Sequence, residues 1–376
     1  VTPEPLTRPA ISTILTGLHP RSHGVDSNTK SLGQEFLTLA EVLSERGYIT
    51  GAFTASTVLE AIYGTGQGFD TYTEPTELPW ELSNLTAIKR LYVSVFDQSR
   101  WNLEIRAEEV TRRAAAWIAE NYHRPFFAFV HYFDPHDPYE PLPEYDLAAR
   151  MGLAEIPVPY DDPQERFMEG FVMPDAYLEM MWLKYRGEIN YMDEHVGKLL
   201  DAVDEMGLRD DTLIILLSDH GEGFENGFYF AHGNRVTDPL VRTAFLVSYP
   251  GRLTPARVET QVSLADVYPS LFSLLGTPVE SNVQGADVLV SGPPEGRPAF
   301  LQTDPANPMP HSSRVSFGLR LPPWKYIESP EIGLVELYDL DGDPAETRNL
   351  ASELPEVRSR PQLIVKEGMA TTEKKE

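Results

Sequence analysis

The fold is decided by residues 212–222, which read TLIILLSDHGE. The segment 212–217 is almost wholly apolar, which is typical of a strand buried on both faces of a parallel sheet. Asp219 and His220 follow the strand directly. Because ligands in parallel α/β sheets bind beyond the carboxyl ends of the strands, this stretch predicts a buried strand that leads into a functional site.

Strand-like and helix-like segments alternate on both sides of this stretch. Helices are predicted at residues 7–17, 38–47, 106–121, 175–206 and 264–275, and further strands at 48–54, 125–133 and 243–248. Thr38 and Glu41 predict a capping box, and Gly17 and Gly47 suit helix ends. The alternation predicts an α/β fold in which helices cover both faces of a mostly parallel sheet.

A second, smaller unit is predicted near the C-terminus. The composition changes at residues 291–296, which read SGPPEG, and strand-like pieces follow at 313–319, 324–327 and 336–340. These pieces predict a small antiparallel subdomain over residues 297–352, after a larger α/β domain over residues 1–290. Residues 353–376, which end in a polar run, are expected to form a tail.

The composition excludes several classes of function. The chain has 376 residues, and 57 acidic against 31 basic side chains give a net charge of −26, which argues against nonspecific binding to nucleic acid or to an anionic membrane. An anionic substrate is compatible with this charge, because a metal ion or local cations can reverse the sign inside a cleft. The absence of cysteine excludes disulfides, cysteine-ligated zinc and a cysteine nucleophile. No apolar run reaches about 18 residues, so no membrane span is predicted in this chain.

Two segments carry the residues on which chemistry is expected. Asp219 with His220 offers a carboxylate oxygen and an imidazole nitrogen, which suits half of a metal site; alternatively, Asp219 caps the next turn and His220 is a hydrogen-bonded loop histidine. Thr7 lies just before a helix, where the dipole and free N–H groups would stabilise an alkoxide and an anionic ester; alternatively, it is a plain N-cap. The residues alone leave these alternatives open.

Six segments, far apart along the chain, resemble motifs of the sulfatase family in the alkaline phosphatase superfamily. Residues 7–20, TRPAISTILTGLHP, resemble the family's nucleophile signature, and residues 217–223, LSDHGEG, resemble its second metal motif. The other four are HYFDPHDPY at 131–139, HGN at 232–234, LADVYPSL at 264–271, and KYI at 325–327 with ELYDL at 336–340. The resemblance extends from Thr7 to Leu350 and implies an alkaline-phosphatase-like fold.

The resemblance also implies roles for five residues. Thr7 would be the nucleophile, and Asp219 and His220 would bind a divalent metal ion, which could be Mn, Zn, Ca or Mg. His136 and His232 would bind the anion or protonate the leaving group. The implied substrate is an anionic ester of a small molecule, a lipid or a glycan, and no nucleic acid partner is expected.

Departures from the family pattern refine this expectation. Family sulfatases have Cys or Ser at the Thr7 position, which is converted to formylglycine, and Arg at the Ile11 position. Thr cannot be converted to formylglycine, and members with Thr resemble the phospho-transferring branches. His220 replaces the Asn of many sulfatases and also fits the phospho- and phosphono-ester branches better. The Asp pair of the family's first strand has no counterpart before Thr7. The resemblance therefore implies that the chain as given lacks that strand and is N-terminally truncated.

These features favour a metal-dependent ester hydrolase or transferase that acts on phosphoric or phosphonic esters through Thr7. A formylglycine hydrate releases sulfate by elimination, and a threonine sulfate has no such route. A threonine phosphate, in contrast, can be hydrolysed by in-line attack. One alternative is a true sulfuric ester hydrolase. The other is a non-catalytic binding or scaffold protein that keeps the fold, which the missing Asp pair supports and which would leave the given chain inactive.

Overall fold

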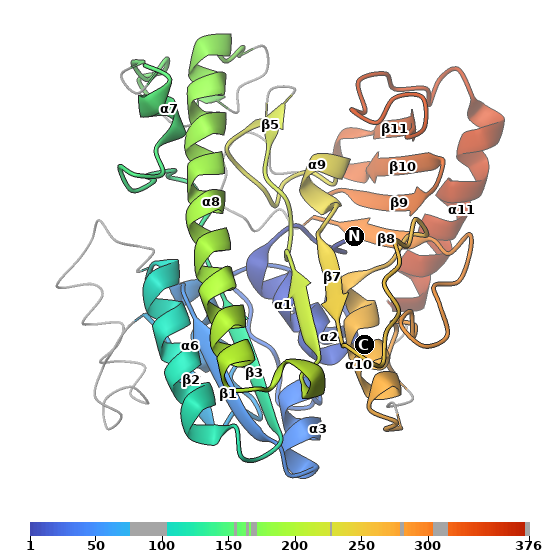
Figure 1. Cartoon of the computed structure of the whole chain (residues 1–376). Helices are drawn as coiled ribbons and strands as arrows, with labels where there is room; N and C mark the ends of the chain where they lie inside the picture. The colour runs from blue at the N-terminus through green and yellow to red at the C-terminus, as the bar shows by residue number, and fades with distance from the viewer. Residues whose placement is uncertain are drawn as a thin grey trace.

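The computed structural model describes residues 1–75, 104–153, 156–162, 165–166, 171–225, 228–278, 282–303 and 315–372. Its regular elements are, in chain order, α1 (Thr7–Thr16), α2 (Pro20–His23), α3 (Leu39–Glu45), β1 (Ile49–Thr54), β2 (Thr71–Thr73), α6 (Ala107–Asn121), β3 (Phe126–His131), α7 (Leu147–Arg150), α8 (Asp175–Glu205), β4 (Ile214–Leu217), β5 (Phe224–Glu225), β6 (Phe228–Tyr229), α9 (Asp238–Val241), β7 (Phe245–Ser248), α10 (Val267–Leu274), β8 (Ala299–Gln302), β9 (Phe317–Leu321), β10 (Trp324–Ser329), β11 (Leu334–Asp339) and α11 (Pro355–Thr372). Figure 1 shows a body of helices and strands with a second sheet beside it.

A parallel sheet in the order β2-β1-β3 lies in the body. Side chains of β3 alternate between its two faces: Phe127 and Phe129 pack on the core around α1, whereas Ala128 and Val130 pack on the core beneath α6. Both faces are therefore covered by helices, which explains why β3 is apolar almost throughout. The predicted α/β architecture is confirmed.

The pairing of β4 differs from the prediction. β4 pairs antiparallel with β7, and within the described residues this pair shares no hydrogen-bonded ladder with the parallel sheet. The chain between the two strands stays at the carboxyl end of β4, where it forms the β5-β6 hairpin and α9. It therefore enters β7 from that end and runs back, which needs no crossover connection.

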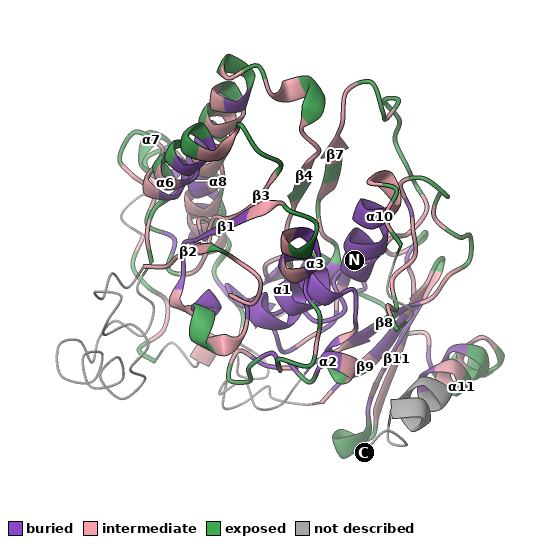
Figure 2. Ribbon diagram, turned by 90° about the horizontal axis from the view of Figure 1, so that it is seen from below, coloured by how far each residue is buried: buried purple, intermediate pink, exposed green. Residues whose placement is uncertain are grey.

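Helix α1 is the buried centre of the body. All of its residues are buried, and Figure 2 shows it enclosed by its neighbours. Its Leu15 is fully buried in a cluster with Leu43 of α3 and Phe272 of α10. A helix that is buried on every side is held by packing, so its ends have defined positions.

The predicted helix ends agree with the structure to within about two residues. Thr38 and Glu41 form the predicted capping box, in which Glu41 N donates to Thr38 Oγ1 at 3.2 Å and Thr38 N donates to Glu41 Oε2 at 2.8 Å. The predicted helix at 264–275 divides into a short 3₁₀ turn and α10.

None of the helices in the described part of the chain has the length and apolar character needed to cross a membrane.

The C-terminal unit is an antiparallel sheet in the order β11-β10-β9-β8. Two residues of the predicted piece at 313–319, Ser313 and Arg314, lie outside the described residues.

The expectation of a tail at 353–376 was wrong, because α11 occupies most of that segment and contacts β9 and β10. Val365 of α11 is 2% exposed and packs with Leu319 and Tyr326. This apolar contact holds the helix on the sheet (Figure 1).

The end of α1 supports a stability prediction. Gly17 has a φ of 68°, and a Cβ there would lie 2.8 Å from Val283 Cγ1 and 2.9 Å from Tyr268 Cβ. Gly47 has a φ of 84° with nothing within 4 Å of the added Cβ. We expect Gly47→Ala to lower the free energy of unfolding by about 1 kcal/mol through backbone strain. Gly17→Ala should cost roughly 2 kcal/mol more, because the methyl group also overpacks the core. Urea denaturation of both variants measures this, and equal losses would contradict it.

Candidate active site

Thr7 is the first residue of α1 and is 2% exposed. The N-cap position belongs to Leu6, so the plain N-cap alternative for Thr7 does not hold. Thr7 Oγ1 instead lies 3.4 Å from His220 Nε2. Arg8 fixes this end of the helix: its Nε donates to Val58 O at 2.9 Å, and its guanidinium lies 3.6 Å above the Tyr63 ring.

The first turn of α1 offers fewer free backbone donors than the sequence suggested. Arg8 N donates to Asn28 Oδ1 at 3.0 Å, and Pro9 has no N–H group. Ala10 N donates to Leu6 O at 3.0 Å. The helix dipole still places positive potential at Thr7, but an anion there must find most of its donors on side chains or a cation.

Asp219 and His220 leave the carboxyl end of β4 and turn toward Thr7. His220 Nδ1 lies 2.8 Å from Gly221 O, so Nδ1 carries the proton and the lone pair of Nε2 is free. His220 Nε2 lies 3.4 Å from Asp219 Oδ2 and 3.4 Å from Thr7 Oγ1. The glycine that follows permits this turn, because a Cβ on Gly221 would lie 1.9 Å from Pro239 O.

Two further histidines lie beside this group. The His232 ring centroid is 4.1 Å from that of His220 and 5.1 Å from that of His136. His136 stacks on Phe133 at 4.2 Å between centroids. The structure thus brings together all five residues named from the sequence, from α1, the end of β3, the end of β4 and the loop before α9.

Sequence reasoning missed two residues of this group. Glu222 accepts from His232 Nδ1 at 3.3 Å, and its position in the SDHGE run was the available signal. His131, at the end of β3, has a buried Nδ1 without a hydrogen-bond partner and interacts electrostatically with Asp219. Its place at a strand end was the signal there.

The histidines of the site differ in the direction in which their surroundings shift the pKa. Burial lowers the pKa of His136 and of His131 to about 4, so both are neutral at pH 7. Burial also acts to lower the pKa of His232, but the Glu222 carboxylate outweighs it and raises that pKa above its usual value. Burial acts to raise the pKa of Asp219, yet His220 and His131 outweigh it and lower that pKa. The site therefore holds an ionised aspartate and one histidine, His232, whose protonated form is favoured by the Glu222 carboxylate.

The donors Asp219 Oδ2, His220 Nε2 and Thr7 Oγ1 converge and are chemically suited to a divalent ion. Over the described ranges, however, no three His, Asp or Glu side chains are arranged to hold a metal. Asp219 and His220 thus fit one half of a metal site. Further ligands would have to come from water, substrate or residues other than these.

Comparison with known proteins settles the family. Residues 1–277 match the family model described as sulfatase. The chain belongs to the sulfatase family. It is therefore a sulfatase-family hydrolase of the alkaline phosphatase superfamily, as the motif resemblance implied.

Two relatives and two solved structures show the extent of the similarity. The choline-sulfatase of Rhizobium meliloti is 26% identical over 93% of this chain and 74% of its own length. The N-acetylgalactosamine-6-O-sulfatase of Bacteroides thetaiotaomicron is 23% identical over 68% of this chain, which spans 50% of that protein. A protein solved with its substrate D-glucosamine-2-N,6-O-disulfate has a TM-score of 0.76 at 17% identity, covering 99% of this chain and 90% of the other. The phosphonate monoester hydrolase of Agrobacterium radiobacter has a TM-score of 0.71 at 22% identity, covering 100% and 88%.

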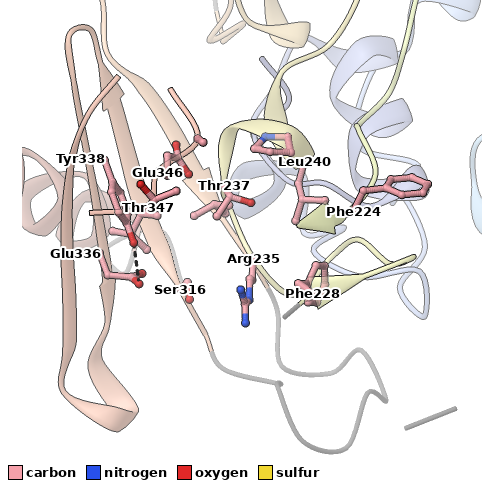
Figure 3. A pocket seen from close by; sticks show the side chains of 15 residues that line it. Phe224, Phe228, Arg235, Thr237, Leu240, Ser316, Glu336, Tyr338, Glu346 and Thr347 are labelled. Carbon is pink, nitrogen blue, oxygen red and sulfur yellow. Dashed lines mark hydrogen bonds between the residues drawn. The ribbon is translucent and has the colours of Figure 1, made fainter. Parts of the chain in front are cut away.

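A cavity of about 220 Å³ is lined by Gly223, which follows Glu222 in the chain, and by residues of the C-terminal sheet (Figure 3). It separates the β6–α9 segment from the C-terminal sheet, and the five site residues do not line it. Arg235 lies 5.1 Å from the Phe228 ring on one wall, and Tyr338 Oη donates to Glu336 Oε1 at 3.2 Å on the other.

Proposed function

We propose that this sulfatase-family protein hydrolyses phosphoric or phosphonic esters, with Thr7 as the nucleophile. The contact that carries the proposal is Thr7 Oγ1 to His220 Nε2 at 3.4 Å, at the buried start of α1. The free lone pair of His220 Nε2 could hold a metal ion next to this buried hydroxyl, which is one way to activate a nucleophile. The sulfatase relatives favour the alternative, a sulfuric ester hydrolase.

In the proposed reaction, Thr7 loses its hydroxyl proton to solvent, and a bond from Oγ1 to phosphorus forms as the bond to the leaving oxygen breaks. His232 holds the proton that this oxygen takes up, because Glu222 keeps the pKa of His232 raised and accepts from its Nδ1. His136, which is neutral, lies beside His232 and can orient the ester oxygens by hydrogen bonding. Water then attacks phosphorus and gives one proton to His232. The bond from phosphorus to Thr7 Oγ1 breaks, and Oγ1 takes up a proton from solvent.

Asp219 and His220 would hold a divalent metal ion. When bound, the ion would lower the pKa of the Thr7 hydroxyl and neutralise charge on the ester. Asp219 is suited to this because its pKa is lowered, and His220 because Gly221 O fixes its tautomer. The nitrogen ligand from His220 favours Mn²⁺ or Zn²⁺ over Ca²⁺. Turnover with Mn²⁺ or Zn²⁺ should therefore be at least as fast as turnover with Ca²⁺.

The test compares steady-state rates on 4-nitrophenyl phosphate, a 4-nitrophenyl phosphonate and 4-nitrophenyl sulfate in the presence of Mn²⁺ or Zn²⁺. We expect turnover on a phosphorus ester to exceed turnover on the sulfate at least tenfold. The sulfate should release about one nitrophenol per enzyme and then stall, because a threonine sulfate has no elimination route. Repeated turnover on the sulfate that is faster than on every phosphorus ester would establish the sulfuric ester alternative. Binding without turnover on any ester would support the scaffold alternative.

A further inference from the structure

A second cavity, of about 180 Å³, adjoins the catalytic group through His136. We call it the acidic cavity. Its lining consists of Glu104, Ile105, Arg106, Phe133, Asp134, His136, Pro138, Glu140 and Glu188. At about 30 Å³ per water, it holds roughly six water-sized groups, which is enough for a short aminoalkyl chain.

The charge of the acidic cavity is strongly unbalanced. Four carboxyl side chains line it, and the guanidinium of Arg106 faces them. Arg106 Nη2 donates to Glu140 O at 3.2 Å, and its Nη1 lies 3.8 Å from Asp134 Oδ1. Asp134 Oδ2 also accepts from Ala107 N at 3.0 Å. One partly engaged guanidinium cannot balance four carboxyl groups once they are ionised, so a bound cation stabilises the ionised form of the cavity.

Glu188 supplies an unused acceptor that lines this cavity. The residue is 5% exposed, and its Oε1 accepts from Glu140 N at 2.7 Å. Its Oε2 is buried without a hydrogen-bond partner. The neighbouring Gly187 lets α8 approach the 141–145 loop closely, since a Cβ there would lie 2.4 Å from Tyr145 O. The orphaned oxygen is therefore held in place, and leaving it unpaired costs free energy that a donor would recover.

We propose that the acidic cavity binds the protonated primary amine of a substrate whose ester group lies at Thr7. This inference rests on the proposed function, because it assigns the second end of the same substrate. An ammonium group supplies both the charge and the N–H donor that Glu188 Oε2 lacks. A quaternary ammonium has no such donor. A divalent metal is disfavoured, because no three acidic or histidine side chains of the described chain are arranged to hold one.

The position of His136 connects the two ends. It lines the acidic cavity, and its ring lies 5.1 Å from His232, which in turn lies 4.1 Å from His220 beside Thr7. A substrate that spans both places carries an anionic ester and a cationic amine, separated by a chain that passes the two imidazole rings. The negative charge of the cavity also disfavours an ester whose other end is anionic.

The binding test uses n-butylammonium chloride, measured by NMR titration against 1-butanol and tetramethylammonium. We expect the wild-type protein to prefer butylammonium to both. Glu188→Gln should weaken its binding about tenfold to a hundredfold, which corresponds to loss of one charge-assisted hydrogen bond. Glu179→Gln is the matched control, because Glu179 is an exposed carboxylate on the same helix. Equal binding by wild type and Glu188→Gln, or tighter binding of Mg²⁺ or Ca²⁺ that displaces the amine, would overturn the proposal.

The pH dependence gives a second measurement that needs no variant. Burial raises the pKa of Glu188 to about 8; Asp134 and Glu104 add to this, while the Glu140 N–H group and Arg106 oppose it. The free cavity therefore holds a proton that an ammonium must displace. Butylammonium, with a pKa near 10.4, stays charged below pH 9, so its affinity should fall about tenfold per pH unit below 8. An affinity that does not change between pH 6 and 9 would contradict the assignment.

A kinetic arm separates this proposal from the proposed function. Rates are compared for 6-aminohexyl and 6-methoxyhexyl 4-nitrophenyl phosphate, whose chains are long enough to pass both imidazole rings. We expect KM for the amino ester to be at least tenfold lower, Glu188→Gln to remove the difference, and the control Glu179→Gln to keep it. Failure to hydrolyse either ester, with Glu188-dependent amine binding intact, would refute the phosphoesterase and leave the cavity assignment standing. Turnover of both esters with equal KM would refute the cavity assignment alone.

Discussion

Thr7→Ala is expected to lower kcat on the best phosphorus ester by at least about a thousandfold, because it removes the atom that would form the covalent intermediate. The fold should survive. The hydroxyl does not cap α1, and its removal breaks one interaction, that of 3.4 Å with His220 Nε2. Loss of the buried hydroxyl and methyl groups should lower the free energy of unfolding by about 1 kcal/mol. Steady-state kinetics and thermal unfolding measure the two effects separately.

Two control variants sharpen this result. Thr7→Ser keeps the hydroxyl and should retain turnover within about a hundredfold of wild type. Ser12→Ala removes another buried hydroxyl from the same helix, one whose Oγ has no hydrogen-bond partner, and should leave kcat unchanged. If Thr7→Ala keeps a tenth or more of the wild-type kcat, Thr7 is not the nucleophile. The sulfatase-family fold would then carry its chemistry elsewhere.

Lys325→Met should produce the largest loss of stability, about 3–5 kcal/mol, because it leaves buried carboxylates without their cation. Lys325 is 0% exposed, and its Nζ donates to Asp238 Oδ1 at 2.9 Å and to Glu346 Oε1 at 2.7 Å. Arg320 also donates to Asp238, at 2.9 Å from Nη2. These contacts join α9 of the body to β9 and β10 of the C-terminal sheet. Urea denaturation followed by circular dichroism measures the loss.

An exposed ion pair in the same unit is the control. Arg348 and Glu353 form a pair at 2.7 Å with side-chain exposures of 69% and 51%. Because solvent screens such a pair, Arg348→Met should change the free energy of unfolding by less than about 0.5 kcal/mol. A loss below about 1 kcal/mol for Lys325→Met would show that the buried carboxylates can be neutralised at little cost.

The ion pairs of Asp238 with Lys325 and Arg320 also make the stability of the fold depend on pH. Burial acts to raise the pKa of Asp238, but Lys325 and Arg320 outweigh it and lower the pKa to about 2. A carboxyl group whose folded-state pKa lies below its unfolded value stabilises the fold above that unfolded value, near 3.9. This stability is lost as the pH falls from about 4 toward 2. Lys325→Met should therefore reduce the acid sensitivity of unfolding over this range.

Local elements and their chemistry could be predicted from the order of the residues. The capping box at Thr38, the left-handed glycine at the end of α1, and the apolar strand leading to Asp219 and His220 depend on neighbouring residues, so spacing alone revealed them. The resemblance of motifs also singled out His136 and His232. Local patterns suffice wherever the deciding contacts lie within a few residues.

The remaining features depend on how distant segments pack together. An apolar strand does not encode the direction of its partner, so the antiparallel pairing of β4 with β7 followed from the route of the intervening chain. The helix α11 forms because Val365 meets a sheet that lies earlier in the chain. The acidic cavity brings Glu104, Asp134 and Glu188 together from distant segments. Each depends on contacts between residues far apart in sequence, whose free energy is gained only when the whole chain packs.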